Sequence, residues 1–336
     1  MGAQQPSIAI AGVGYWGKNL LRTFRHLPDA RVTALCDLDA DRLSAARKEH
    51  TGLRCTDDFA RLIARDDVDA VVIATPPSRH HAMALAALRA GKHVWVEKPL
   101  ALAAAEGREL VDAAAAARRI LFVDQTFLYD PLVLEMKRII DAGALGDVMH
   151  LSFERLGMGR IRRDSNVWWN SAPHDLSILF HLIPRPVTAI QLHCHTHLQP
   201  GIADMAICDL ELEGGTSAHI HLSWLHPEKT AKVVVVGRTR MLVYEGRFEK
   251  RGLTLYDYTV DLGEEAGSGR SDVPISGFAG RRLEVAAGEE PLALAAAHFV
   301  ECVRTGAEPR TSGARSLRVV EVLERAERTA SSGGTA

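Results

Sequence analysis

The chain has 336 residues, of which 47% are hydrophobic and 24% are charged, and its formal net charge is −2. These are globular values, and a chain of this length favours two domains over one. The near balance of charges argues against a nucleic-acid-binding protein, and no apolar run is long enough to span a bilayer. The five cysteines are scattered without a C-x-x-C pair. We therefore expect a cytoplasmic protein with reduced thiols that binds neither nucleic acid nor membrane.

Strand-like and helix-like segments alternate through the first 125 residues. An apolar run at Ser7–Ala11 leads into helical periodicity over Trp16–Phe24, and the alternation continues to a strand at Ile120–Asp124. Residues Val68–Ala74 are almost continuously apolar, as expected for a central parallel strand that is buried on both faces. The pattern predicts an α/β domain over residues 1–125, with a parallel sheet and helices on both of its faces.

The pattern changes after a helix predicted over Pro131–Ala142. The β-like segments that follow are Val148–Leu156, Val187–His197, Met205–Leu212, Ser217–Trp224, Lys232–Val236, Met241–Tyr244 and Leu253–Tyr258. One short helix, predicted at about Pro173–Leu182, interrupts them. A polar, Gly-rich loop is predicted over Gly263–Ser276, and the helices Leu292–Thr305 and Ala314–Thr329 follow.

These segments predict a C-terminal α+β domain over residues 126–330, built on an open, mainly antiparallel sheet. Its role would be substrate binding and oligomerisation, and its final helices are candidates to pack back on the first domain. The polar tail, residues 331–336, is expected to be disordered.

A glycine-rich turn joins the first strand to the first helix. Gly12, Gly14 and Gly17 fit G-x-G-x-x-G, and the next strand ends on Asp37, 20 residues after Gly17. The glycines allow a tight turn, a close approach to a pyrophosphate, and close packing of helix on strand. Asp37 can accept hydrogen bonds from both adenosine ribose hydroxyls and would repel a 2′-phosphate, while Leu38 offers no compensating cation. The sequence therefore predicts a Rossmann domain that favours NAD over NADP.

Two further turns end strands at the same edge of the predicted sheet, where ligands bind in such folds. Thr75-Pro76-Pro77 follows the Val68–Ala74 strand, and Glu97-Lys98-Pro99 follows a strand at His93–Glu97. A lysine that leaves a buried strand towards a cofactor can position a substrate hydroxyl, and burial lowers the pKa of such a lysine. By itself the motif fits a surface Lys-Pro turn equally well.

Motifs along nearly the whole chain carry a family resemblance. They are GVGYWG (12–17), CDLD (36–39), VVIATPPSRHH (71–81), AGKHVWVEKPLA (90–101), TFLYDP (126–131), WWNSAPHDLSI (168–178), SWLHPEK (223–229), VVGRTRMLVYE (235–245) and EPLALAAAHFVECVRTGAEPRTSG (290–313). On these residues the chain resembles the glucose–fructose oxidoreductase / inositol dehydrogenase / MocA oxidoreductases. It looks most like bacterial members that act on sugars or nucleotide-sugars, including nucleotide-sugar 3-dehydrogenases.

The resemblance implies that Lys98 and His174 surround the reacting carbon, together with a position where the family carries aspartate. That position is Asn170 here. Asn can hydrogen-bond a substrate hydroxyl but cannot ionise, so the role of base falls on His174. Because Pro173 precedes His174 and proline favours the first turn of a helix, we expect His174 to lie near a helix N-terminus. An imidazolium is disfavoured there, which would leave a neutral base near pH 7.

The resemblance extends to the binding residues. The predicted cofactor-binding residues are Gly12, Gly14, Tyr15, Trp16, Gly17, Asp37, Leu38, Thr75, Pro76, His80, Glu97, Lys98 and Gln125. His80 would lie near the nicotinamide and its ribose, and Gln125 stands where many members carry histidine. The predicted substrate-binding residues are Tyr129, Arg155, Arg162, Asn166, Trp169 and His174. The arginines would suit a phosphate or nucleotide diphosphate, with solvated loop arginines as the alternative.

Histidines alternate along two predicted strands, at His193, His195 and His197 and at His219 and His221. Three imidazoles spaced along one strand span too great a length to close easily on one zinc ion. We therefore predict a polar sheet face and no metal site. In the family that this chain resembles, the open sheet face is commonly an oligomer interface, so we expect a homodimer or homotetramer.

Together these features predict an NAD-dependent dehydrogenase acting on a secondary alcohol or ketone of a sugar. The substrate would be a sugar phosphate or nucleotide-sugar, with C3 a candidate for the reacting carbon. A cyclitol dehydrogenase with the same mechanism is one alternative. A non-catalytic NAD-sensing regulator on the same fold is another, because Asn170 lacks the charge of the usual aspartate. A third is an oxidoreductase that keeps its cofactor and passes hydride between two substrates.

Overall fold

A computed structural model describes residues 5–247, 250–260, 273, 275–286 and 288–332 of the chain. The chain forms two compact units. The first comprises Met1–Asp130 and Gly288–Glu324, and the second comprises Pro131–Ala287 and Arg325–Ala336.

The first unit is built on a six-stranded parallel sheet. Its strands are β1 (Ser7–Ala11), β2 (Arg31–Cys36), β3 (Arg54–Thr56), β4 (Ala70–Ile73), β5 (His93–Glu97) and β6 (Leu121–Asp124). Their order is β3-β2-β1-β4-β5-β6, so the direction of winding reverses between β1 and β4. This is the doubly wound order that binds dinucleotides at the carboxyl ends of its strands, and it confirms the predicted fold class.

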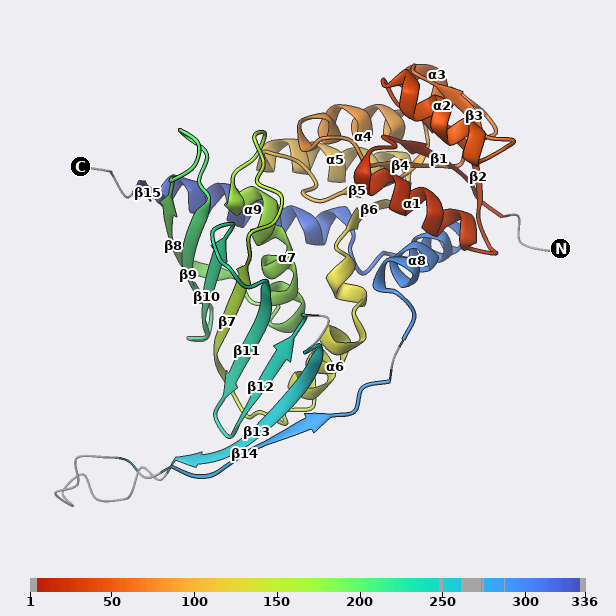
Figure 1. The fold of residues 1–336 in the computed structure, drawn as a ribbon. Helices are drawn as coiled ribbons and strands as arrows, with labels where there is room; N and C mark the ends of the chain where they lie inside the picture. The colour runs from red at the N-terminus through yellow and green to blue at the C-terminus, as the bar shows by residue number, and fades with distance from the viewer. Residues whose placement is uncertain (1–4, 248–249, 261–272, 274, 287, 333–336) are drawn as a thin grey trace. The chain divides into compact units, whose positions relative to one another are not determined.

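Helices cover both faces of this sheet (Figure 1). They are α1 (Tyr15–His26), α2 (Ala40–Glu49), α3 (Phe59–Ile63), α4 (His80–Arg89), α5 (Ala104–Ala117) and α8 (Pro291–Thr305). Helix α1 packs beside α8, and α4 packs beside α5. A last helix, α9 (Gly313–Thr329), follows α8. The short elements β3 and α3 carry too few residues for a periodicity, and the sequence did not predict them.

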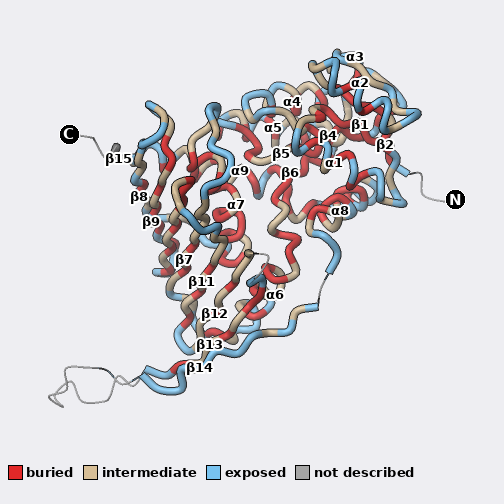
Figure 2. The backbone as a smooth tube through the Cα atoms, in the orientation of Figure 1, coloured by how far each residue is buried: buried red, intermediate tan, exposed pale blue. Residues whose placement is uncertain are grey.

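Aromatic rings fill the core between the sheet and α1 and α8. Trp95 stacks on Phe122 with ring centroids 4.4 Å apart, and Phe24 and Phe299 meet Trp95 edge-on. All four side chains are fully buried. Strand β4 is buried at every position, as Figure 2 shows for the centre of this sheet. This burial explains why residues 70–73 are apolar without alternation.

The second unit is built on a nine-stranded sheet of order β14-β13-β12-β11-β7-β10-β9-β8-β15. The strands are β7 (Val148–Leu156), β8 (Val187–His195), β9 (Met205–Leu212), β10 (Ser217–Ser223), β11 (Thr230–Gly237), β12 (Arg240–Glu245), β13 (Gly252–Val260), β14 (Ile275–Leu283) and β15 (Ser331–Ser332). Only the β7–β10 and β8–β15 pairs of these described strands are parallel. The prediction of a mainly antiparallel sheet is confirmed.

Two helices pack on this sheet. Helix α7 (Val167–Leu182) contacts β7, β9 and β10, and α6 (Pro131–Asp141) contacts β12 and β13. Buried and accessible residues alternate along β9 and β10. One face of these strands is therefore covered, which fits the period of two that identified them in the sequence.

Four sequence predictions for the second unit need correction. Helix α7 begins at Val167 rather than at about Pro173, because Asn166 caps it. Strand β8 ends at His195, so His197 lies beyond it. Ile275–Ser276 belongs to β14 rather than to the predicted loop, most of which lies outside the described residues. Ser331–Ser332 pairs with β8 and is not disordered, whereas residues 333–336 lie outside the described part of the chain.

Candidate active site

The glycine-rich turn lies at the carboxyl end of β1, beside the end of β4. Gly12 has a φ of +90°, and a Cβ on it would stand 2.6 Å from the carbonyl oxygen of Ala74. A Cβ on Gly17 would stand 1.9 Å from the carbonyl oxygen of Gly12. Neither position can hold a side chain without moving backbone atoms. The turn therefore requires glycine at two places for reasons internal to the fold.

The same turn opens helix α1 at Gly14. No side chain of the described residues caps this N-terminus, and the first turn of α1 carries no acidic residue. The first N–H groups of a helix have no partner within the helix and carry a partial positive charge. An N-terminus that no described side chain caps suits an anionic group, and the crowded glycines hold it in place. These residues fit the pyrophosphate of a dinucleotide.

Asp37 ties the loop after β2 to the glycine turn. Its Oδ2 accepts a hydrogen bond of 2.7 Å from the backbone N–H of Val13, and its Oδ1 accepts one of 2.9 Å from Asp39. Its carboxylate is 8% exposed. Each oxygen keeps room for a further donor, so the arrangement fits the predicted contact with ribose hydroxyls. Leu38, by contrast, is 86% exposed.

His80 joins the two turns that follow β4 and β5. It is fully buried, and its Nδ1 and Nε2 lie 2.8 and 2.9 Å from the carbonyl oxygens of Pro99 and Thr75. Burial lowers the pKa of His80, against the opposing effect of these two carbonyls. His80 therefore lies between the Thr75 and Lys98–Pro99 turns, and in its neutral form its single N–H can donate to one of the two carbonyl oxygens. The predicted contact of His80 with the cofactor stays a prediction.

Two carboxyl groups meet where β5 and β6 end side by side. Glu97 and Asp124 are register partners, and Asp124 is 2% exposed. Burial, and then the charge of Asp124, raise the pKa of Glu97 well above its ordinary range. Trp16 Nε1 and Thr126 Oγ1 donate to Asp124 at 3.3 and 2.6 Å. The surroundings of Glu97 therefore favour its protonated form more than those of an exposed glutamate do. Glu97 and Trp16 are among the predicted cofactor residues, whereas Asp124 is not, because its only signal in the sequence is its place at the end of a strand.

In the second unit, Asn170 and His174 share one face of α7. They are four residues apart, and both are partly accessible while Trp168, Trp169 and Asp175 are buried. Side chains at i and i+4 are neighbours on a helix surface. His174 is the eighth residue of α7, two turns from its start. The expectation that a helix N-terminus keeps His174 neutral is therefore wrong.

A buried ion pair fixes α7 to the sheet next to His174. Arg155 on β7 donates from Nε and Nη2 to the two carboxylate oxygens of Asp175, at 3.1 and 2.6 Å. The two side chains are 20% and 3% exposed. The charge of Asp175 raises the pKa of Arg155 although burial acts in the opposite direction. Arg155 is a predicted substrate-binding residue, and its partner Asp175 was not predicted.

The remaining predicted substrate residues have structural partners of their own. Arg162 forms two hydrogen bonds of 2.9 Å with Asp164. Asn166 accepts from the backbone N–H of Trp169 and so caps α7. In the first unit, the hydroxyl of Tyr129 lies 2.8 Å from Nδ1 of His298 on α8. Their contacts with a substrate stay predictions.

The cofactor residues that remain differ in exposure. Tyr15 is 72% and Trp16 37% exposed, while Gln125 is buried.

Among the described residues, no three histidine, cysteine, aspartate or glutamate side chains form a metal-binding group. His197 and His219 instead pair with Asp204 and Asp209, at 2.9 and 2.7 Å.

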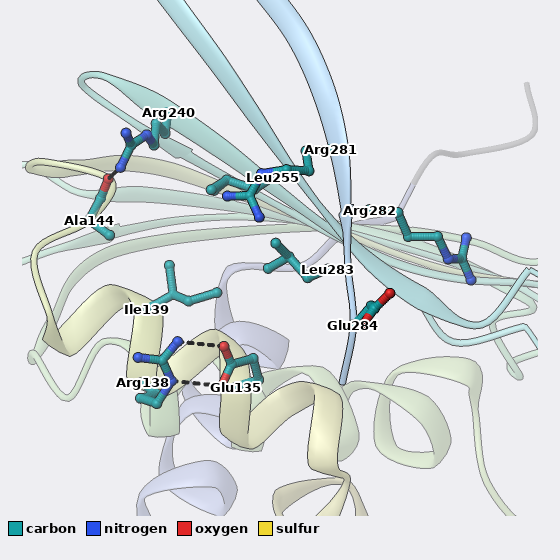
Figure 3. A pocket seen from close by; sticks show the side chains of 10 residues that line it. All are labelled: Glu135, Arg138, Ile139, Ala144, Arg240, Leu255, Arg281, Arg282, Leu283 and Glu284. Carbon is teal, nitrogen blue, oxygen red and sulfur yellow. Dashed lines mark hydrogen bonds and ion pairs between the residues drawn. The ribbon is translucent and has the colours of Figure 1, made fainter. Parts of the chain in front are cut away.

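A hollow of about 630 Å³ lies within the second unit, and its lining includes no residue of α7 (Figure 3). Helix α6 forms one wall and strands β12 to β14 the other. Arg138 on α6 is bound to Glu135, and Arg240 donates to Asp257 and to the carbonyl oxygen of Ala144. None of the predicted site residues lines this hollow.

Comparison with known proteins gives the family. Residues 7–125 match the "Oxidoreductase family, NAD-binding Rossmann fold", and residues 133–243 match the "GFO/IDH/MocA C-terminal domain". The chain belongs to the GFO/IDH/MocA oxidoreductase family. This confirms the resemblance inferred from the motifs, and membership in an oxidoreductase family agrees with the prediction that the chain is an enzyme.

Curated relatives are similar over different shares of their length. Inositol 2-dehydrogenase 2 of Saccharopolyspora erythraea is 32% identical over 64% of this chain and 66% of its own length. The glycosyl hydrolase family 109 proteins match this chain over 33% of their own length. The chain therefore spans two thirds or less of the length of these three relatives. D-apiose dehydrogenase of Paraburkholderia graminis is 25% identical over 97% of this chain and 88% of its own length.

Solved structures share the fold of this family member. UDP-N-acetylglucosamine 3-dehydrogenase from Acidithiobacillus ferrooxidans has a TM-score of 0.81 at 22% identity, covering 96% of this chain and 97% of that one. Aldose-aldose oxidoreductase from Caulobacter crescentus has a TM-score of 0.82 at 20% identity and covers 97% of each chain. At these identities the likeness shows the fold alone.

No described helix is long and apolar enough to cross a membrane.

Proposed function

We propose that this chain is an NAD-dependent dehydrogenase that transfers hydride between nicotinamide and a secondary alcohol or ketone of a sugar. A sugar phosphate or a nucleotide-sugar is the substrate class we favour, with C3 as the candidate carbon. The observation that carries the proposal is the glycine turn, which cannot hold side chains at Gly12 or Gly17 and opens a helix that no described side chain caps. Such a cradle fits a pyrophosphate. Family membership and the similarity to D-apiose dehydrogenase support the reaction class.

The residues have separate roles in this proposal. NAD, when bound, supplies the hydride acceptor. His174 takes the proton of the substrate hydroxyl, and Lys98 hydrogen-bonds the same oxygen and stabilises its developing negative charge. Asn170, one helical turn before His174, orients the substrate with its amide. Ketone reduction uses the same groups in reverse.

Asp37 supports NAD over NADP in the same proposal. Its carboxylate is buried and already accepts two backbone N–H groups. A 2′-phosphate beside it would place like charges together in a site of low solvent exposure, which is unfavourable. Ribose hydroxyls, in contrast, are donors that the remaining lone pairs can accept.

Association into a homodimer or homotetramer through the nine-stranded sheet belongs to the proposal as well. Helices α6 and α7 cover one face of that sheet. On β10, His219 and His221 lie at half-accessible positions that alternate with buried ones. A face of this kind can be covered by a second copy of the chain.

The test is turnover with a panel of sugars, sugar phosphates and nucleotide-sugars, followed by the near-ultraviolet absorbance of reduced NAD. Lys98→Ala and His174→Ala should each lower kcat by about 10²- to 10⁴-fold, the usual contribution of acid–base groups. Lys48→Ala, which changes an exposed lysine on α2, is the charge-matched control. Unchanged turnover in both active-site variants would refute the proposal.

A cyclitol dehydrogenase is the second candidate, because the inositol 2-dehydrogenase of Saccharopolyspora erythraea is 32% identical over 64% of this chain. The mechanism would be the same, since an inositol also presents a ring of secondary alcohols. Inositols in the same substrate panel separate the two candidates by their kcat/KM values relative to those of the sugars.

A further inference from the structure

A cation lies beside Asp37 and the glycine turn, where the proposed site would hold the adenosine ribose. Arg42, in the first turn of α2, places Nη1 3.8 Å from Oδ2 of Asp37. The same Nη1 lies 3.7 Å from where a Cβ of Gly14 would stand. The guanidinium therefore borders the space in front of both Asp37 and the turn. Its side chain is half exposed, so one side of it remains open to a ligand.

Asp39 fixes the direction in which Arg42 points. Its Oδ1 caps α2 by accepting from the backbone N–H groups of Asp41 and Arg42, at 3.0 and 3.1 Å. Its Oδ2 lies 3.1 Å from Nε of Arg42. The Nε edge of the guanidinium is thereby occupied, while Nη1 is directed to Asp37 and Gly14. A planar fork held at one edge keeps donors for a second anion at the other.

We propose that Arg42 is a determinant of cofactor specificity: with Asp37 present the Nη1 side of Arg42 faces a carboxylate and NADP is rejected, and without that carboxylate Nη1 of Arg42 binds the 2′-phosphate of NADP. The inference rests on the proposed dinucleotide site and goes beyond it, because it assigns the discrimination to a pair of residues. Asp37 repels the phosphate and also occupies the cation that would otherwise attract it. Loss of one side chain then changes both effects together.

The test measures the Kd of NAD and of NADP by isothermal titration calorimetry for the unaltered protein, Asp37→Ser, Arg42→Gln and the double variant. In Asp37→Ser, we expect NADP to bind at least about 30-fold more tightly than in the unaltered protein, as one or two charge-assisted hydrogen bonds predict. NAD should bind about tenfold more weakly, because the charged acceptor for the ribose hydroxyls is gone. The double variant should lose the gain for NADP. Arg47→Gln, on the same helix, removes the same charge elsewhere and is the control.

Arg42→Gln keeps the inference falsifiable if Asp37→Ser unfolds through loss of its two backbone hydrogen bonds. This single variant leaves Asp37 without its cation, so NADP should bind at least threefold more weakly while NAD changes less. The inference is overturned if Asp37→Ser, folded by its thermal melt, gains no affinity for NADP, or if the gain survives in the double variant. Unaltered protein that binds neither dinucleotide would instead overturn the proposed function.

Discussion

A few individual side chains, and glycines where a side chain would not fit, shape the carboxyl edge of the parallel sheet. Asp37 accepts a backbone N–H with each of its carboxylate oxygens, and His80 lies between the carbonyl oxygens of the Thr75 and Pro99 turns. Gly12 and Gly17 contribute by leaving room for backbone. The edge is therefore held in shape by the protein itself, and a cofactor would meet a largely preorganised site.

Gly12 and Gly52 allow a matched test of this crowding. Both have a positive φ, +90° and +88°, but a Cβ on Gly52 would meet nothing within 4 Å, whereas one on Gly12 would meet the Ala74 carbonyl at 2.6 Å. Gly52→Ala should cost about 1–2 kcal/mol, the strain of a left-handed residue. Gly12→Ala should cost more and also abolish NAD binding. Equal losses in urea unfolding and unchanged NAD affinity would contradict this account.

His93 gives the first unit a dependence on acid. Its Nδ1 accepts a hydrogen bond of 3.0 Å from the backbone N–H of Ile120, which requires an unprotonated nitrogen. Burial, and then the charge of Arg119, lower the pKa of His93 to about 4. The unfolded chain, with a pKa near 6.5, binds the proton first. The stability that unprotonated His93 contributes is therefore fully present above about pH 6.5, and it is lost as the pH falls towards 4.

The measurement is the free energy of unfolding in urea between pH 7.5 and 4. His93→Asn can still offer an acceptor to Ile120 but does not titrate, so its stability should fall less steeply over this range. The same slope in both proteins would show that His93 is not a source of the acid sensitivity.

At the scale of elements, α7 depends on a buried ion pair for its place on the sheet. Removing one partner of such a pair leaves an uncompensated charge and costs about 3–5 kcal/mol. Asp175→Asn should therefore destabilise the protein by that amount and also lower kcat, because His174 is the adjacent residue. The Arg162–Asp164 pair has similar geometry but is exposed. Asp164→Asn should cost less than about 1 kcal/mol.

Urea unfolding and steady-state kinetics of the two variants supply the comparison. Equal effects of Asp175→Asn and Asp164→Asn would mean that burial of the Arg155–Asp175 pair has no energetic consequence. A loss of stability in Asp175→Asn without a change in kcat would separate the support of α7 from the positioning of His174.

For the whole molecule, the proposed cofactor should raise the free energy of unfolding. A ligand that binds only the folded state at about 100 times its Kd stabilises that state by about 2.7 kcal/mol. NAD at this excess should raise the unfolding midpoint in a thermal melt, and the shift should be absent in Gly12→Ala. A midpoint that NAD leaves unchanged would contradict binding to the folded protein.

The amino-acid sequence by itself determined the features that depend on neighbouring residues. Strand and helix periodicities predicted both sheets, and the spacing of Gly12, Gly14, Gly17 and Asp37 predicted the dinucleotide cradle. The placement of Lys98 and His174 in one active site came from family resemblance and stays a prediction.

Only the tertiary structure decided which distant residues meet. The predicted start of α7 was wrong, because Pro173 is a stronger sequence signal for the start of a helix than Asn166 and the two tryptophans after it. It also missed Arg42 beside Asp37, Asp124 beside Glu97 and Asp175 beside Arg155. Such pairs depend on strand register and helix packing, which join residues that no local period relates. The spacing of the glycines is enough to predict the turn, whereas only the tertiary structure shows which charged side chains lie beside it.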